Sequence, residues 1–293
     1  MKEERTKSLF MLIGSMLIFG TVGVFRRFIP LPSAMLACIR GLLGGIFLCA
    51  VILIKRRSLR FSFSKKQVLL LILGGAFLGA NWILLFEAYN NTSVAVATLC
   101  YYAEPTIVIL LSPLIFREKL TLKKSLCASV SLVGIALVSG VIGNGDQLAG
   151  NIKGIFFGLG AALLYSAVVI VNKKNPTDDS YGSTVIELFS AAFVLLPYVI
   201  IYEDFSRISL SPFALIMIVS VGILHTGVAY SLYFGSMRAL PSQTVALMSY
   251  IDPVFALVLS AVFLKEPMTP LMLIGAVLII GAAAFSETAT KRK

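Results

Sequence analysis

Charged residues are scarce in this sequence, and their scarcity argues against a soluble fold. Asp, Glu, Lys and Arg make up 13% of the 293 residues, whereas a soluble domain carries about 25%. Hydrophobic residues make up 58%. A soluble chain of this length can bury a core without so many apolar residues. The excess therefore indicates a second apolar environment, a lipid bilayer.

Catalytic and metal-binding motifs are also missing. The sequence contains one histidine, His225, and no Walker, GxSxG or HExxH motif. The four cysteines (Cys38, Cys49, Cys100 and Cys127) form neither a CxxC pair nor a Cys/His metal spacing, so we expect buried free thiols. We predict no cofactor, no resident metal, no ATP-driven pump and no enzyme.

Long apolar stretches are what the sequence does contain. A helix needs about 20 apolar residues to cross a hydrocarbon core of about 30 Å. Ten stretches of roughly this length are separated by short polar connectors: 8–25, 33–54, 68–89, 93–116, 124–142, 151–172, 182–201, 212–234, 243–264 and 267–286. The first is too long for a signal peptide and lacks a cleavage site, so it is a retained span. The predicted fold is an all-α integral membrane protein of ten transmembrane helices.

The positive charge separates by loop. With the N-terminus inside, the outer loops hold only Arg26, Arg27, Lys153, Arg207 and Lys265, and nearly all other lysines and arginines lie on the inner side. Cytoplasmic loops carry this excess in membrane proteins. We therefore predict two cytoplasmic termini, and the net charge of +11 gives no support for nucleic-acid binding. Short loops favour a bacterial inner membrane.

The chain also repeats itself at an offset of 148 residues. Residues 86–121 match 234–269, with identities that include Phe86/Phe234, Tyr102/Tyr250 and Glu118/Glu266. Half of ten spans is five, and an odd number turns the second copy upside down. The sequence predicts two inverted repeats, residues 1–146 and 147–293, with a substrate site near the midplane between them.

The sequence resembles the EamA-like ten-helix family of the drug/metabolite transporter superfamily. The resemblance covers nearly the whole chain and rests on the five-plus-five arrangement and Arg40 in the second span. It rests also on the proline-bearing fourth and ninth spans, each followed by a glutamate (Glu118, Glu266) and a threonine. It implies export or exchange of amino acids, other metabolites or drugs, and it does not fix the substrate.

Four charged side chains stand out because they lie inside predicted spans, away from the span ends: Arg40, Glu104, Glu187 and Asp252. Each costs about 2.5–3.5 kcal/mol at a helix centre, so such residues usually face a bundle interior or a cavity. The repeat places Glu104 and Asp252 at similar depth on related helices. Glu187 fits a structural role as well as a functional one.

Glu104 and Asp252 each precede a proline. A proline inside a helix removes a backbone donor and frees the carbonyl four residues earlier. Broken helices of this kind build midplane sites in transporters. We predict that six residues line a central pathway: Tyr101, Tyr102, Glu104, Ser249, Tyr250 and Asp252. The alternative is that the prolines only shape packing and the acids only bond to neighbours.

Other candidate site residues keep two interpretations. Arg40 either clamps a substrate carboxylate or serves as a structural counter-ion. His225 either relays protons or is a neutral, hydrogen-bonded core residue. Trp82 and its repeat partner Tyr230 form either cavity walls or aromatic core. The small-residue pairs Gly41/Gly45, Gly75/Gly79 and Gly154/Gly158 predict close helix packing.

The function predicted from these residues is a secondary transporter that works by alternating access. Three intramembrane acids against one arginine favour amino acids or other amine-bearing solutes, and the family resemblance implies that they are exported. The alternatives are a multidrug exporter of lipophilic cations, a non-transporting membrane scaffold and a channel. Expected partners are a small-molecule substrate and membrane lipids; proton coupling, and monomer against homodimer, stay open.

Overall fold

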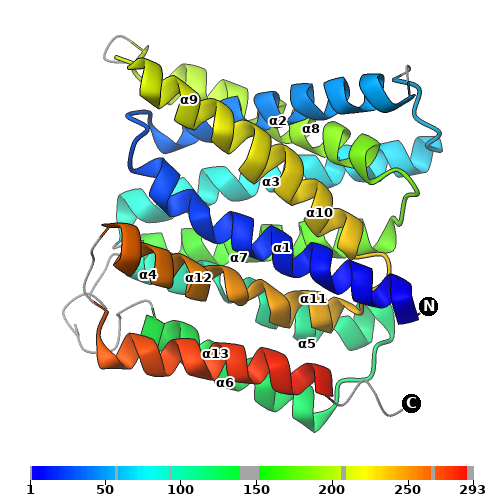
Figure 1. Ribbon diagram of the computed structural model, residues 1–293, viewed down its shortest axis with the longest axis vertical. Coiled ribbons are helices and arrows are strands. Elements are labelled where there is room, and N and C mark those ends of the chain that lie inside the picture. Colours follow the sequence, from blue (N-terminus) through cyan, green and yellow to red (C-terminus); the bar gives the residue numbers. More distant parts are fainter. Residues whose placement is uncertain are drawn as a thin grey trace.

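The computed structural model describes residues 2–56, 59–92, 94–138, 152–205, 209–264 and 268–288. Throughout these residues the regular structure is helical (Figure 1). The helices of the first half are α1 (Lys2–Arg26), α2 (Ser33–Arg56), α3 (Lys65–Asn91), α4 (Val94–Tyr101), α5 (Glu104–Phe116) and α6 (Leu122–Val138). Those of the second half are α7 (Ile152–Lys174), α8 (Ser180–Tyr202), α9 (Pro212–Ser220), the π-helical η3 (Val221–Val228), α10 (Ala229–Ser236), α11 (Ser242–Ser249), α12 (Ile251–Leu259), the π-helical η4 (Ser260–Leu264) and α13 (Pro270–Thr288).

These elements form the ten expected spans. Eight helical stretches are long and apolar enough to cross a membrane, and α13 contributes a shorter apolar stretch over Pro270–Ser286. The fifth span is α6, which has 17 residues. Three spans are composite: α4 with α5, α9 with η3 and α10, and α11 with α12 and η4. The first helix begins before the expected residue 8, because Glu3 and Glu4 in its first turn favour a helix N-terminus.

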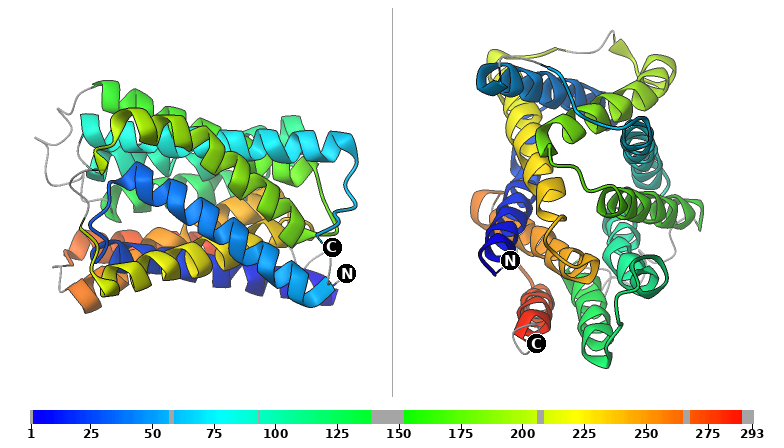
Figure 2. Two further views of the ribbon diagram at one scale, coloured as in Figure 1. Left: turned by 90° about the horizontal axis from the view of Figure 1, so that it is seen from above. Right: turned by 90° about the vertical axis from the view of Figure 1, so that its right-hand side faces the viewer.

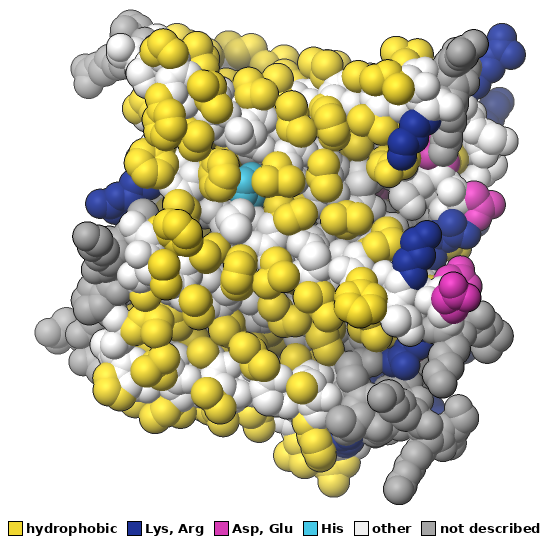
Figure 3. All heavy atoms as spheres, viewed as in Figure 1, with side chains coloured by type: hydrophobic (Ala, Val, Ile, Leu, Met, Phe, Trp, Pro, Cys, Tyr) yellow, Lys and Arg dark blue, Asp and Glu magenta, His cyan; other side chains and the backbone are white. Residues whose placement is uncertain are grey.

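Both ends of the described chain lie on the same face of the bundle. Figure 1 shows the start of α1 and the end of α13 on that face, here named the terminal side; the opposite face is the distal side. Lys and Arg side chains gather mainly on the terminal side (Figure 3). The structure thus reproduces the charge separation from which we predicted cytoplasmic termini, and that orientation stays a prediction.

The two repeats interleave rather than form separate lobes. In end view the helices run side by side, and α13 lies against α6 at one edge of the bundle (Figure 2). The contacts of α3 with α7 are matched by those of α1 with α10, and the contacts of α3 with α8 by those of α2 with η3. Each match exchanges the equivalent helices of the two repeats, as an approximate two-fold axis requires. The predicted boundary at residues 146 and 147 lies outside the described residues.

Glycines bring α3 onto α8, as predicted. A Cβ atom built on Gly75 would lie 2.3 Å from the Glu187 carbonyl oxygen, and one on Gly79 would lie 2.6 Å from the Ala191 carbonyl oxygen. Backbone cannot move away as a flexible side chain can, so only glycine fits at these two positions. Gly41 is different, because a Cβ there would make ordinary contact with the Leu188 carbonyl oxygen at 3.4 Å.

We expect Gly75→Ala to lower the free energy of unfolding by about 1–3 kcal/mol, because the added methyl group must push α3 away from α8. The readout is the thermal unfolding midpoint of the purified protein in detergent. Gly14→Ala is the matched control, since a Cβ on Gly14 has nothing within 4 Å. Equal midpoints for the two variants would show that the α3–α8 contact is not tight.

Candidate functional site

A cavity of about 190 Å³ lies inside the bundle, where helices of both repeats meet. It is lined by Met16, Phe19, Val22, Arg40, Trp82, Leu85, Phe86, Tyr101, Tyr102, Glu104, Pro105, Tyr165, Tyr230, Tyr233, Ser249 and Asp252. Eight of the ten residues predicted for the pathway are on its wall: Arg40, Trp82, Tyr101, Tyr102, Glu104, Tyr230, Ser249 and Asp252. The repeat explains much of this, because Trp82/Tyr230, Tyr101/Ser249 and Glu104/Asp252 are related by the offset of 148.

Two helix interruptions deliver the acids to this cavity. The fourth span breaks between Tyr101 and Glu104, and the ninth breaks at Tyr250. Glu104 and Asp252 therefore stand in the first turns of α5 and α12, where the helix dipole favours a negative charge. Proline follows each acid and suits the start of a helix, where its missing N–H has no partner to lose.

Neither acid forms an ion pair with a described residue. Glu104 is buried, with 4% of its surface exposed, and its backbone carbonyl accepts a hydrogen bond from the Ser166 hydroxyl at 3.3 Å. Asp252 is half-buried, and the Tyr102 hydroxyl is its hydrogen-bonding neighbour. Two carboxylates thus line the cavity without an ion-pair partner among the described residues.

Arg40 supplies the opposite charge on the same wall. Its guanidinium carbon lies 4.6 Å from the centre of the Trp82 ring, a cation–π contact. Among the described residues Arg40 has no ion-pair partner, and its buried Nε has no hydrogen-bond acceptor. The structural counter-ion interpretation therefore finds no acid to pair with Arg40 in the described chain.

Aromatic rings make up most of the remaining wall. Tyr165 and Tyr233 stack with their centres 6.4 Å apart and planes at 9°, and Tyr101 lies 5.9 Å from Tyr165. The sequence analysis missed Tyr165 and Tyr233. Tyr233 lies one helical turn from Tyr230, which is a usable signal, whereas Tyr165 corresponds to Leu17 in the first repeat and has none.

Tyr250 and His225, also predicted for the pathway, are not among the residues that line this cavity. The Tyr250 hydroxyl donates to the Tyr102 carbonyl at 3.2 Å and lies 2.9 Å from the Thr106 hydroxyl. Tyr250 therefore satisfies the carbonyl exposed by the break in the fourth span. His225 is fully buried. Its Nε2 lies 2.6 Å from the Thr21 hydroxyl, and this hydrogen bond joins η3 to α1.

Two further acids of the spans, Glu187 and Glu87, contact residues outside the cavity. Glu187 is fully buried and accepts a hydrogen bond from the Asn172 amide at 2.7 Å, beside Gly74 of α3. Glu87 accepts one from the Tyr198 hydroxyl at 2.5 Å near the distal side. Glu187 thus lies at the junction of α3, α7 and α8, and its other carboxylate oxygen is buried without a hydrogen-bond partner among the described residues.

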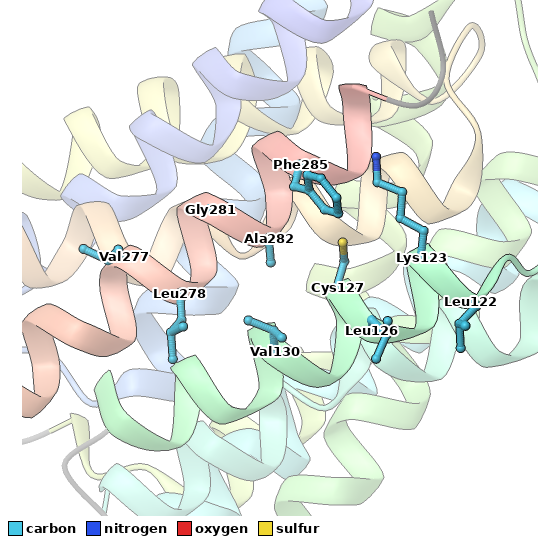
Figure 4. Close-up of a pocket in the computed structure, with 10 residues that line it drawn as sticks. All are labelled: Leu122, Lys123, Leu126, Cys127, Val130, Val277, Leu278, Gly281, Ala282 and Phe285. Carbon is cyan, nitrogen blue, oxygen red and sulfur yellow. The ribbon is translucent and has the colours of Figure 1, made fainter. Parts of the chain in front are cut away.

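A second hollow, between α6 and α13, has a different character (Figure 4). It measures about 610 Å³ and has apolar walls apart from Lys123, whose ammonium nitrogen lies 3.9 Å from the centre of the Phe285 ring. Leu122, Val277 and Phe285 are each more than half exposed there. This groove is part of the exposed apolar surface of the bundle and lacks the carboxylates and the guanidinium of the central cavity.

Comparison with known proteins decides the family. Residues 6–140 and 152–288 each match the model of the EamA-like transporter family. The chain belongs to this family. An uncharacterized transporter of Bacillus subtilis, YxxF, is 32% identical over 263 residues, which are 89% of this chain and 83% of YxxF. The resemblance to the drug/metabolite transporters is thereby confirmed.

Two further similarities bear on this EamA-like transporter. The threonine/homoserine exporter RhtA of Escherichia coli is 24% identical over 286 residues, which are 97% of this chain and 91% of RhtA. A solved crystal structure covers 98% of both chains with a TM-score of 0.85 at 18% identity, which supports the fold alone. The protein is a multi-pass membrane transporter with a ten-helix fold.

Proposed function

We propose that this transporter exports a small zwitterion, an amino acid or a close relative, by alternating access through the central cavity. The observation that carries the proposal is that one cavity holds the guanidinium of Arg40 and the carboxylates of Glu104 and Asp252. Arginine binds a carboxylate through two parallel hydrogen bonds, and a carboxylate binds an ammonium group. The aromatic wall offers further contacts for a cation.

Charge balance supports an amine in the substrate. With all three groups ionised the cavity carries one net negative charge, because two carboxylates face one guanidinium. A zwitterion together with a proton balances this charge, and so does an amine without a carboxylate. A proton shared with Glu104 or Asp252 would then couple transport to the proton gradient.

The size of the cavity supports this proposal over multidrug export. Sites for drug-sized ligands measure about 300–1,000 Å³. The central cavity, at about 190 Å³, is smaller than that range and suits a small metabolite. The name of RhtA, a threonine/homoserine exporter, agrees with this substrate class and with export. We place the terminal side in the bacterial cytoplasm, so that export runs from the terminal to the distal side.

A ligand panel tests the substrate class. The thermal unfolding midpoint of the purified protein is measured with an amino acid, its methyl ester, the amine that lacks its carboxylate, and a lipophilic cation. A ligand at 100 times its Kd stabilises the folded state by about 2.7 kcal/mol. We expect the largest rise with intact amino acids and its loss in Asp252→Asn. Rises with many lipophilic cations and none with amino acids would instead support a multidrug exporter.

A further inference from the structure

The repeat relates two polar hollows that lie at opposite ends of the central cavity. The distal vestibule measures about 470 Å³ and the terminal-side pocket about 90 Å³. Their walls share four positions at the offset of 148: Pro32/Ser180, Phe86/Phe234, Tyr89/Met237 and Asn90/Arg238. Inverted repeats in one conformation would give similar hollows at the two ends. The fivefold difference in volume therefore indicates that this structure is closed on the terminal side.

The two related phenylalanines differ in the same way. Phe86 lines both the central cavity and the distal vestibule, so its side chain lies at the boundary between them. Phe234 lines the terminal-side pocket but not the central cavity. Its ring packs 5.4 Å from Tyr230 and 5.6 Å from Tyr233, which form the cavity wall. Phe234 of the terminal-side pocket thus contacts the cavity wall without lining the cavity, whereas Phe86 lines both the cavity and the vestibule.

Two half-buried charged side chains, Lys173 and Glu118, stabilise the terminal-side barrier. Segment 237–243 comprises the connection from α10 to α11 and the first two residues of α11, on this side. Lys173 of α7 donates to the Met237 carbonyl at 2.8 Å and also to the Leu240 carbonyl, at the end of α10. Glu118 accepts from the Ser242 amide at 2.8 Å and the Gln243 amide at 3.4 Å, at the start of α11. Each charge is also favourable at the helix end that it contacts, because Lys173 lies at the negative C-terminal end of α10 and Glu118 at the positive N-terminal end of α11.

Glu118 is placed for this contact by the end of α5. Arg117 adopts a left-handed conformation, with φ 56° and ψ 26°, which ends the helix and turns the chain. The side-chain amide of Gln243 also donates a hydrogen bond to the Ser112 hydroxyl at 2.5 Å, which ties α11 to α5. Hence segment 237–243 cannot leave α5 and α7 without breaking charge-assisted hydrogen bonds.

The position equivalent to Lys173 in the first repeat is not charged. The offset of 148 sets Phe25 against Lys173, and Asn90 against Arg238. Glu266, the counterpart of Glu118, lies outside the described residues. At the position equivalent to Lys173, the first repeat thus has an uncharged residue.

We propose that segment 237–243 is the terminal-side gate, that Glu118 and Lys173 form the latch that holds it shut, and that Phe86 is the distal gate. Opening to the terminal side then requires both latch contacts to break while Phe86 closes over the cavity. This assignment rests on the transport fold and does not depend on which solute is carried.

The test measures access to the cavity from each side without any substrate. Ser249→Cys places a thiol on the cavity wall in a variant whose four native cysteines are replaced. Its reaction rate with a small membrane-impermeant thiol reagent is measured in vesicles of both orientations, assigned by an N-terminal tag. We expect the parent to react mainly from the distal side. Lys173→Met and Glu118→Gln should each raise the rate from the terminal side about tenfold or more, because each removes hydrogen bonds to a charged group.

Three controls make the result decisive. Lys173→Arg keeps the donor and should behave as the parent does. Asp178→Asn breaks the exposed Arg238–Asp178 ion pair of the same region, and such pairs contribute little, so its rates should not change. Phe86→Ala should raise the rate from the distal side alone, and this holds even if a latch variant fails to fold. Unchanged terminal-side rates in folded latch variants, or equal rises from both sides, would overturn the proposal.

Discussion

Asp252→Asn and Glu104→Gln are each expected to lower amino-acid exchange in proteoliposomes about a hundredfold. Both changes keep the shape of the side chain and remove a negative charge that, in the proposed function, binds the substrate ammonium in the central cavity. Leaving one member of a buried charge pair without its partner costs about 3–5 kcal/mol, and about 1.4 kcal/mol corresponds to a factor of ten. The readout is the initial rate of exchange at a fixed amount of reconstituted protein.

Asp178→Asn is the matched control for these two variants, since it neutralises an acid whose side chain is 97% exposed, far from the cavity wall. It should exchange at the rate of the unmodified protein. The variants must also insert and unfold thermally as that protein does. Normal exchange by both Asp252→Asn and Glu104→Gln would remove the cavity acids from the mechanism and favour the interpretation in which they only support packing.

Arg40→Met is expected to change the selectivity of exchange more than its overall rate. Without the guanidinium, the substrate carboxylate loses two charge-assisted hydrogen bonds, and exchange of an amino acid should fall about a hundredfold. The corresponding amine has no carboxylate to lose and should keep most of its rate. The measured quantity is the ratio of the two exchange rates in the same vesicles.

Arg40→Lys separates charge from geometry in this position. Lysine keeps the positive charge but cannot form the planar two-bond contact, so an intermediate ratio is expected. If Arg40→Met lowered the rates of the amino acid and the amine equally, Arg40 would act on the fold and not on the carboxylate. The cation–π contact with Trp82 makes that outcome a real alternative, and the ratio discriminates between the two.

Much of the fold follows from the sequence because a bilayer constrains it so strongly. Backbone groups in hydrocarbon must bond within the chain, so an apolar stretch of sufficient length forms a helix. The repeat then adds what hydropathy cannot: it pairs Glu104 with Asp252 and Trp82 with Tyr230, and the structure brings all four to one cavity. The prolines correctly located the breaks that bring the two acids there.

What the sequence did not reveal depends on the direction of side chains and on which helices become neighbours. Tyr165 sits in an apolar span with no charge, proline or repeat partner to distinguish it, yet α7 turns it towards the cavity. Tyr250 carries the same signals as Tyr102, but its hydroxyl reaches the fourth span and bonds to the Tyr102 carbonyl. The interleaving of the repeats was equally hidden, because the sequence pattern describes each repeat and not the contacts between them.

Counterflow in proteoliposomes tests the central claim most directly. Vesicles that contain the purified transporter are loaded with unlabelled amino acid, and uptake of the same labelled amino acid is followed. The account predicts rapid exchange that is competed by solutes bearing both an ammonium and a carboxylate group, with weak competition by the methyl ester or by the acid without its amine. Protein-dependent exchange of lipophilic cations with none of amino acids would contradict it.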